Sequence, residues 1–202
     1  IVVANKSPMN ESTMKDAKQV KMICQLSTGY DNVDIEYCKN RGIHVANARN
    51  YSTAAVAQHT VALALSVLEN LPYYDNYVKS GAYASQPRFA HFKPWYELEG
   101  KTWGIAGMGN IGRRVAKAAE ALGCKVIFYA TSGHSDCRDY ERVDWDTLLA
   151  QSDILSLHCP LSDRTFHLMN ADAFSKMKKS AVLINVARGA VVDTDALYEA
   201  LV

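Results

Sequence analysis

The chain has 202 residues, 49% of them hydrophobic and 21% charged, so it is long enough for one large domain or two smaller ones and can bury a core. Its 22 basic and 21 acidic residues give a net charge of +1 without a basic block, which excludes the electrostatic footprint of a nucleic-acid-binding protein. No apolar run approaches the ~20 residues of a membrane helix, so we expect no membrane partner. The five cysteines form no CxxC pair, so we expect mostly buried, reduced thiols in a cytoplasmic protein.

Residues 1–46 are expected to form a small β/α unit. Three short apolar runs, at Ile1–Ala4, Met22–Leu26 and Ile43–Ala46, are separated by polar stretches that carry helix signals. The first residues, IVVANK, are neither a signal peptide nor an initiator methionine, so we expect the chain to begin inside a longer protein.

A helix is expected over residues 52–70, with Ser52 and Thr53 as candidates for its N-cap. The run TAAVAQHTVALALSVL is apolar on nearly every side, which predicts a helix buried between two bodies. Such a helix would cross from one domain to the other.

Residues 71–98 are rich in aromatic residues and turn formers, and we expect them to form an arm. The arm buries its aromatic side chains either against its own domain or against a second subunit, and both alternatives stay open. The residues concerned are Tyr73, Tyr74, Tyr77, Tyr83, Phe89, Phe92, Trp95 and Tyr96, with Pro72, Pro87 and Pro94 between them.

After Gly100 the pattern alternates regularly between strands and helices, which predicts a parallel, doubly wound α/β sheet of the Rossmann type. The expected strands are Thr102–Ala106, Lys125–Tyr129, Ile154–His158 and Ala181–Val186. The expected helices are Ile111–Leu122, closed by Gly123, then Trp145–Ala150, and Ala171–Lys178, capped by Asn170.

The segment WGIAGMGNIG places three glycines between the first of these strands and its helix. Gly107 permits a tight turn, Gly109 lets backbone approach a pyrophosphate, and Gly112 lets the helix pack on the strand. The helix N-terminus adds amides and a positive dipole. A GxGxxG match alone is weak, but this context predicts a dinucleotide site rather than a ligand-free turn.

The next strand ends without the acidic residue that usually binds the adenosine ribose. Ala130 stands at that position, followed by the hydroxyls of Thr131 and Ser132, with Arg138 nearby. The missing carboxylate favours NADP slightly over NAD, because a carboxylate there would repel a 2′-phosphate. NAD binding through Thr131 and Ser132 remains the alternative.

Four segments together resemble the D-2-hydroxyacid dehydrogenase family, and the resemblance runs nearly from end to end. They are LSTGYDNVD, the STAAVAQHTVALAL helix, GKTWGIAGMGNIGRRVA, and SLHCPLSDRTFHLMN followed by AVLINVARG. The stretch VKSGAYASQPRFAHFKPWYELEGKTWGI looks most like members that act on hydroxypyruvate and glycerate. The family has a flavodoxin-like substrate domain and a Rossmann-type cofactor domain. The resemblance implies an incomplete substrate domain over residues 1–46, a cofactor domain over residues 47–202, and a homodimer.

The resemblance also implies roles for individual residues. Arg188 in INVARG matches the catalytic arginine, whose paired donors can hold a carboxylate and polarise a keto oxygen. Thr28 and Gly29 match the amides that hold the substrate carboxylate. The cofactor-binding positions are Gly107, Gly109, Asn110, Ile111, Gly112, Thr131, Ser132, Cys159, Pro160, Val186 and Ala187. Cys159 is expected to pack rather than to act as a nucleophile, and no metal is implied.

The histidine and glutamate that handle the proton in this family lie well after the arginine, and neither can be assigned here. His158 and His59 fall in other segments, so we expect packed or cofactor-side histidines, and we draw nothing from Gln58. The 202 residues therefore resemble a protein cut at both ends.

These observations predict reversible hydride transfer between NAD(P)H and a small 2-keto acid, with hydroxypyruvate and D-glycerate as the expected pair. Two alternatives remain. One is a dinucleotide-sensing, corepressor-like protein of the same fold, which would bind cofactor without turnover. The other is an inactive fragment.

Overall fold

The computed structural model describes residues 1–85 and 93–202 of the chain. The contacts divide it into two compact units, residues 1–53 and 54–202. This boundary lies a few residues later than the one expected from the sequence, at residues 46 and 47. The assignment of the two units to substrate and cofactor stays a prediction.

Unit 1 is a three-stranded parallel sheet in the order β1-β2-β3, as the three apolar runs predict. Its elements are β1 (Val2–Ala4), α1 (Glu11–Met14), β2 (Met22–Gln25), α2 (Ile35–Asn40) and β3 (His44–Asn47). Both helices begin at a side-chain cap, Asn10 for α1 and Asp34 for α2. The buried core of the unit includes Ile23, Cys38 and Ile43.

Unit 2 is a five-stranded parallel sheet in the order β6-β5-β4-β7-β8, which confirms the expected Rossmann-type fold. The strands are β4 (Thr102–Ala106), β5 (Lys125–Tyr129), β6 (Glu141–Arg142), β7 (Ile154–Leu157) and β8 (Val182–Asn185). The helices are α3 (Thr53–Leu68), α4 (Leu71–Lys79), α5 (Asn110–Ala121), α6 (Trp145–Gln151), α7 (Ala171–Lys176), the 3-10 turn η1 (Gly189–Val191) and α8 (Thr194–Leu201).

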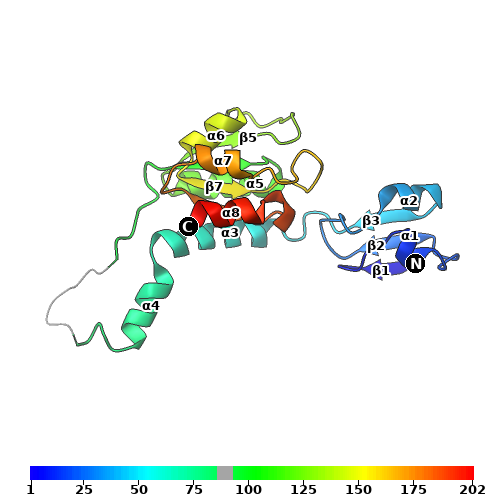
Figure 1. Ribbon diagram of the computed structural model, residues 1–202, viewed down its shortest axis with the longest axis horizontal. Helices are drawn as coiled ribbons and strands as arrows, with labels where there is room; N and C mark the ends of the chain where they lie inside the picture. The colour runs from blue at the N-terminus through cyan, green and yellow to red at the C-terminus, as the bar shows by residue number, and fades with distance from the viewer. Residues whose placement is uncertain (86–92) are drawn as a thin grey trace. The chain divides into compact units, whose positions relative to one another are not determined.

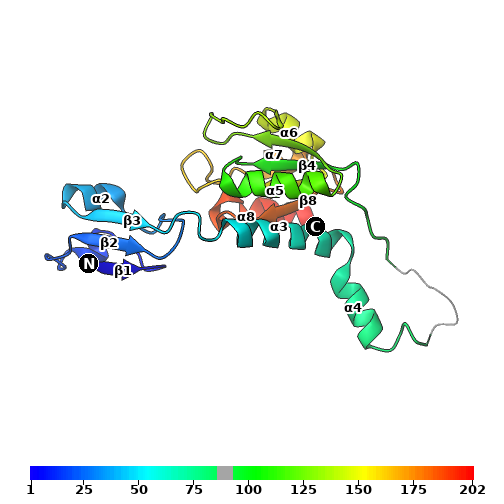
Figure 2. The ribbon, with the colours of Figure 1, turned by 180° about the vertical axis from the view of Figure 1, so that it is seen from behind.

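Helices cover both faces of this sheet. One apolar cluster joins α3 and α5 to the strand residues Trp103 and Phe128, on the face seen in Figure 2. A second cluster joins α6 and α7 to Leu155 and Leu157, on the face seen in Figure 1. Because strand residues alternate between the two clusters, the sheet is buried on both sides and is doubly wound.

The order of strands reverses at the centre of the sheet. From β4 the chain passes through α5 to β5 on one side, and it later returns to β7 on the other side of β4. Ligands of open parallel sheets bind beyond the carboxyl ends of the strands at such a reversal. The turn that begins at Gly107 and the residues after Leu157 therefore lie at the position where open parallel sheets bind their ligands.

The α3 helix begins at Thr53 and buries one face, through Ala57, Thr60, Ala64 and Leu68. Ala54, Ala62 and Val67 on its other sides are exposed in the chain as described, and the expectation of a helix buried between two bodies stays a prediction. The boundary between the two units falls at the first residue of α3, and the role of α3 as a crossover helix stays a prediction.

The aromatic segment contains a helix, α4, that the sequence analysis did not predict. The helix has no buried residue. Its Tyr77 ring instead lies 6.2 Å from the Tyr73 ring of the same helix and 6.2 Å from the ring of Tyr83, which follows the helix, as measured between ring centroids. Trp95 and Tyr96 are about half exposed. The expected residues Pro87, Phe89 and Phe92 lie outside the described residues. Whether the segment packs on its own domain or on a second subunit stays open.

In the described part of the chain, no single helix is long and apolar enough to cross a membrane. Helices α3 and α4 pass that test of length and composition only as a pair, with a bend of 63° between them.

Candidate functional site at the carboxyl edge of the unit 2 sheet

The turn between β4 and α5 is built around Gly107, which lies at the reversal of strand order. Its φ of +100° belongs to the region that favours glycine. A Cβ at this position would lie 3.0 Å from the backbone of both His158 and Cys159. Gly107 therefore lets the turn pass directly against the residues that follow β7.

The other two glycines of the motif differ in what surrounds them. A Cβ on Gly112 would lie 2.3 Å from the carbonyl oxygen of Gly107, so the helix packs on the turn backbone to backbone. A Cβ on Gly109 would meet nothing within 4 Å. The close approaches expected of Gly107 and Gly112 are present, and Gly109 faces open space of the kind that a pyrophosphate would fill.

Helix α5 begins at this open space. Its N-cap, Gly109, has no side chain to bond the amides of the first turn. Asn110 is exposed, and Ile111 is half-buried against the apolar cluster under α3 and α5. A helix N-terminus with backbone amides directed at open space suits a phosphate group, so the residues present fit the dinucleotide that the motif predicts.

The strand β5 ends at Tyr129, and a turn follows. Ala130 is buried, while Ser132 and Gly133 are exposed and Thr131 is half-buried. Two arginines contact this turn: Arg142 Nη2 donates to the Gly133 carbonyl at 2.8 Å, and Arg164 Nη1 donates to the Ser132 carbonyl at 3.3 Å. The sequence analysis named Arg138 as the nearby cation, but the described residues show no hydrogen bond or ion pair of Arg138.

A chain of buried polar groups runs beneath the Gly107 turn. Trp103 Nε1 donates to Ser156 Oγ at 2.9 Å, and Ser156 Oγ lies 3.0 Å from His158 Nε2. The Ser156 oxygen accepts from the indole N–H and can either donate to Nε2 or accept from it, so the direction of this contact follows the imidazole tautomer. The Nδ1 of His158 is buried and has no partner among the described residues.

Burial lowers the pKa of His158 from 6.5 to about 4, so this imidazole is neutral at neutral pH. The packed alternative fits His158, whose Nδ1 is buried. It does not fit His59, which lies exposed on α3 beside the exposed Gln58, and the cofactor-side alternative stays a prediction for both histidines. The partnership of His158 with Trp103 and Ser156 could not be predicted from the sequence, because it joins β4 to the end of β7 and leaves no local signal.

The residues after β7 and β8 form the rest of this edge. Cys159 is 3% exposed, and burial raises the pKa of its thiol, which favours packing over nucleophilic chemistry. Pro160 is exposed, and its carbonyl accepts a hydrogen bond from the Thr165 hydroxyl at 2.6 Å. Val186 and Ala187 are half-buried, each packed against one of the two apolar clusters of the sheet.

Arg188 follows β8 at the same edge of the sheet as the Gly107 turn. The amide of Asn185 shapes its backbone, because Asn185 Nδ2 donates to the Arg188 carbonyl at 2.8 Å and Asn185 Oδ1 accepts from the Ala187 N–H at 3.0 Å. The guanidinium is half-buried and donates through Nη1 to the Ala187 carbonyl at 3.0 Å. A held cation at the carboxyl edge is suited to bind a carboxylate.

In unit 1, Thr28 and Gly29 form a turn after β2. Asn47 Nδ2 donates to the Thr28 carbonyl at 2.7 Å, and the Ser27 hydroxyl donates to the Gly29 carbonyl at 2.6 Å. Among the described residues, neither Thr28 nor Gly29 donates its own backbone N–H to an acceptor. The carbonyls of this turn are thus bonded while its amides stay available for an anionic group such as a carboxylate.

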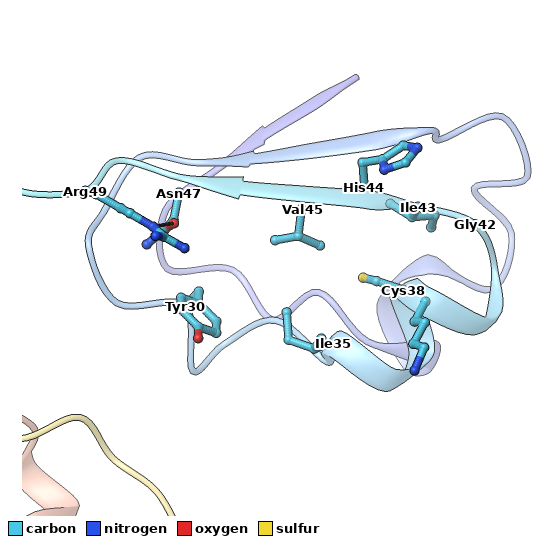
Figure 3. Close-up of a pocket in the computed structure, with 10 residues that line it drawn as sticks. Tyr30, Ile35, Cys38, Gly42, Ile43, His44, Val45, Asn47 and Arg49 are labelled. Carbon is cyan, nitrogen blue, oxygen red and sulfur yellow. Dashed lines mark hydrogen bonds between the residues drawn. The ribbon is translucent and has the colours of Figure 1, made fainter. Parts of the chain in front are cut away.

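A hollow of about 510 Å³ lies beside this turn, between α2 and β3. Figure 3 shows Ile35 and Val45 facing each other across it, with Tyr30 and Arg49 toward one end. Its lining is mainly apolar. The sequence analysis assigned no residue to it. Among the described residues, no group of three His, Cys, Asp or Glu side chains is placed to hold a metal ion.

Comparison with known proteins identifies relatives over the whole chain. The family model described as the NAD-binding domain of D-isomer specific 2-hydroxyacid dehydrogenases matches residues 61–202. A glycerate dehydrogenase from Methylorubrum extorquens is 40% identical over 202 residues, which are all of this chain and 63% of that protein. The chain thus spans less than two thirds of this relative's length.

Solved structures give the same picture. A D-lactate dehydrogenase from Aquifex aeolicus, complexed with NAD and lactic acid, matches 98% of this chain and 60% of its own with a TM-score of 0.88 and 35% identity. An acyclic imino acid reductase in complex with NADPH and D-Arg matches 98% of this chain and 63% of its own, with a TM-score of 0.89 and 32% identity. These relatives differ in both cofactor and substrate.

The two glycines with different surroundings should respond differently to substitution. Gly109→Ala should cost about 1 kcal/mol of stability or less, because alanine is a poorer N-cap, while its Cβ hinders the pyrophosphate and weakens NADH binding about tenfold or more. Gly112→Ala should lower stability further, since its Cβ overlaps the Gly107 carbonyl. Urea unfolding and NADH fluorescence titration measure both effects, and unchanged NADH affinity in Gly109→Ala would contradict the phosphate-binding role of the turn.

The buried His158 should make the fold sensitive to acid. Its folded-state pKa, about 4, lies below the unfolded value of 6.5, so its contribution to stability is complete above pH 6.5 and is lost as the pH falls toward 4. The urea midpoint should therefore fall between pH 6.5 and 4.5 in the wild type and fall less in His158→Gln. Parallel pH profiles for the two proteins would show that His158 titrates normally.

Proposed function

Because the chain belongs to the D-isomer specific 2-hydroxyacid dehydrogenase family, we propose that the protein transfers a hydride between a nicotinamide dinucleotide and a small 2-keto or D-2-hydroxy acid, with hydroxypyruvate and D-glycerate as its pair. The observation that carries this proposal is the shared edge of the unit 2 sheet. The glycine turn suited to a pyrophosphate and the cation Arg188 lie at the carboxyl ends of β4 and β8, strands joined through β7.

The chain's own residues divide the work of binding. The turn from Gly107 to Gly112 holds the pyrophosphate, Thr131 and Ser132 lie at the adenosine ribose, and Cys159, Pro160, Val186 and Ala187 line the nicotinamide side. A bound nicotinamide supplies or accepts the hydride. Arg188 binds the carboxylate of the 2-keto acid and polarises its keto oxygen. The backbone amides of Thr28 and Gly29 are further donors for the carboxylate of such a substrate.

The proposal of hydroxypyruvate rests on the stretch from Val78 to Ile105 and on the similarity to a glycerate dehydrogenase. The direct test is oxidation of NADPH and NADH in the presence of hydroxypyruvate, glyoxylate and pyruvate. The intact mass of the purified protein fixes which residues are present in the assay. Turnover fastest with hydroxypyruvate supports the proposal. Tight cofactor binding without turnover on any of the three acids favours the dinucleotide-sensing alternative.

We propose NADP as the preferred cofactor, because the end of β5 carries no carboxylate. The Ala130 side chain is small and buried, and in the exposed turn beyond it the Ser132 hydroxyl donates to the His134 carbonyl at 2.9 Å. No negative charge at these positions repels a 2′-phosphate, whereas an acidic residue there would favour the ribose hydroxyls of NAD.

A homodimer and a cytoplasmic location are further parts of the proposal. Support for the dimer comes from apolar side chains on α3 and α4: Val67, Leu71 and Val78 are each about half exposed. A second copy of the chain could cover them together with the tyrosines of α4.

Substitution of Arg188 should separate chemistry from cofactor binding. Arg188→Ala should lower kcat/KM for hydroxypyruvate by about 10²- to 10³-fold, since the variant loses a donor aimed at the developing charge. The dissociation constant for NADPH should change less than twofold. Arg188→Lys keeps the charge without the bidentate geometry and should remain impaired. Steady-state kinetics and fluorescence titration decide the matter, and wild-type turnover in Arg188→Ala would end the assignment.

An acidic residue at the end of β5 should shift the cofactor preference. Ala130→Asp should weaken NADPH binding relative to NADH on the order of tenfold, because the carboxylate repels the 2′-phosphate. Ala130 is buried, so Ser132→Asp at an exposed position of the same turn serves as a second variant. The ratio of the two dissociation constants is the readout. An unaltered ratio in both variants would show that this turn does not read the 2′-phosphate.

A further inference from the structure

Two guanidinium groups from different segments contact the turn after β5, and a third binds an aspartate that follows this turn. Arg164, in the loop after β7, donates to the Ser132 carbonyl, and Arg142, on the edge strand β6, donates to the Gly133 carbonyl. Arg113, on α5, forms an ion pair with Asp136, which follows the same turn. Arg142 is 9 positions from Gly133 in the sequence and Arg164 is 32 positions from Ser132, so these contacts form only in the folded chain.

The loop that carries Arg164 is closed by its own hydrogen bonds. The Thr165 hydroxyl donates to the Pro160 carbonyl at 2.6 Å, and the Ser162 N–H donates to that hydroxyl at 2.8 Å. Thr165 is buried while Arg164 beside it is exposed. The buried threonine thus fixes the loop, and the loop presents the arginine at the Ser132 carbonyl.

The carboxylates in the segments around the turn are Asp136, Asp139, Glu141 and Asp163. Asp136 is matched by Arg113, and Glu141 is matched by Lys125 at 3.0 Å. Among the described residues, Arg142 and Arg164 have no carboxylate partner, although Asp163 is next to Arg164 in the chain. Each guanidinium has five N–H donors, and each of the two arginines uses one N–H in its hydrogen bond to the turn. The remaining donors can bind a doubly charged phosphate.

We propose that Arg164 determines cofactor specificity by binding the 2′-phosphate of NADP(H), with Arg142 as the second cation. This inference rests on the proposed function, because it needs a dinucleotide on the glycine turn with its adenosine ribose at Thr131 and Ser132. The cation comes from the loop after β7, and not from Arg138, which the sequence places closest to the turn.

The test compares the dissociation constants of NADPH and NADH, which differ only in the 2′-phosphate, by fluorescence titration of the purified chain. The wild type should prefer NADPH by about tenfold or more, which corresponds to about 1.4 kcal/mol. Arg164→Gln should remove most of that preference while leaving the NADH constant within about twofold, and Arg164→Lys should restore part of it. Arg138→Gln is the matched control, since it removes the same charge without touching the turn, and it should keep the preference.

Each other outcome has a definite meaning. Equal affinities for NADPH and NADH in the wild type, or equal losses in Arg164→Gln and Arg138→Gln, would overturn the role of Arg164 while leaving the glycine turn as a dinucleotide site. No binding of either cofactor would overturn both this inference and the cofactor site of the proposed function. A preference that depends on Arg164, in a protein that turns over no keto acid, would support this inference and reject the proposed reaction.

Discussion

The site depends on one close approach of backbone to backbone. The Gly107 turn lies against the residues after β7, and Gly112 lies against the Gly107 carbonyl, so neither position has room for a Cβ. This contact joins strand β4, helix α5 and the end of β7 at the point where strand order reverses. The open space at Gly109 and the first turn of α5 exist because those three elements meet so closely.

Side chains of β4 and of the end of β7 also form hydrogen bonds near the Gly107 turn. Trp103 and Ser156 lie on neighbouring strands, β4 and β7, and their hydrogen bond continues to His158 at the carboxyl end of β7. The hydrogen bond between Trp103 and Ser156 links the side chains of the two strands, so it helps to hold β7 against β4. Cys159 and Pro160, which follow His158, are thereby held at the edge where the nicotinamide is proposed to lie.

Much of unit 2 could be predicted from the sequence. Apolar runs between turn residues place Thr102–Ala106 and Lys125–Tyr129 at their observed bounds, and Gly123 ends α5 with a φ of +81°. Strand β6 and helix α4 could not be predicted, because local sequence patterns do not indicate them. Strand β6 has two residues and exists through pairing with β5, while α4 lies in a stretch whose prolines and aromatic residues indicated an arm. The glycine turn was predictable because its constraints are local, whereas the contacts of Arg142 and Arg164 arise only in the folded chain.

The central claim is that a nicotinamide dinucleotide binds at the carboxyl edge of the unit 2 sheet, over the first turn of α5. The most direct measurement is the change in backbone amide NMR signals when NADPH is added to the isotope-labelled chain. We expect the largest shifts at Gly109, Asn110 and Ile111, with further shifts at Thr131 and Ser132. Saturating NADPH that leaves the amides of residues 107–112 unshifted would contradict this claim.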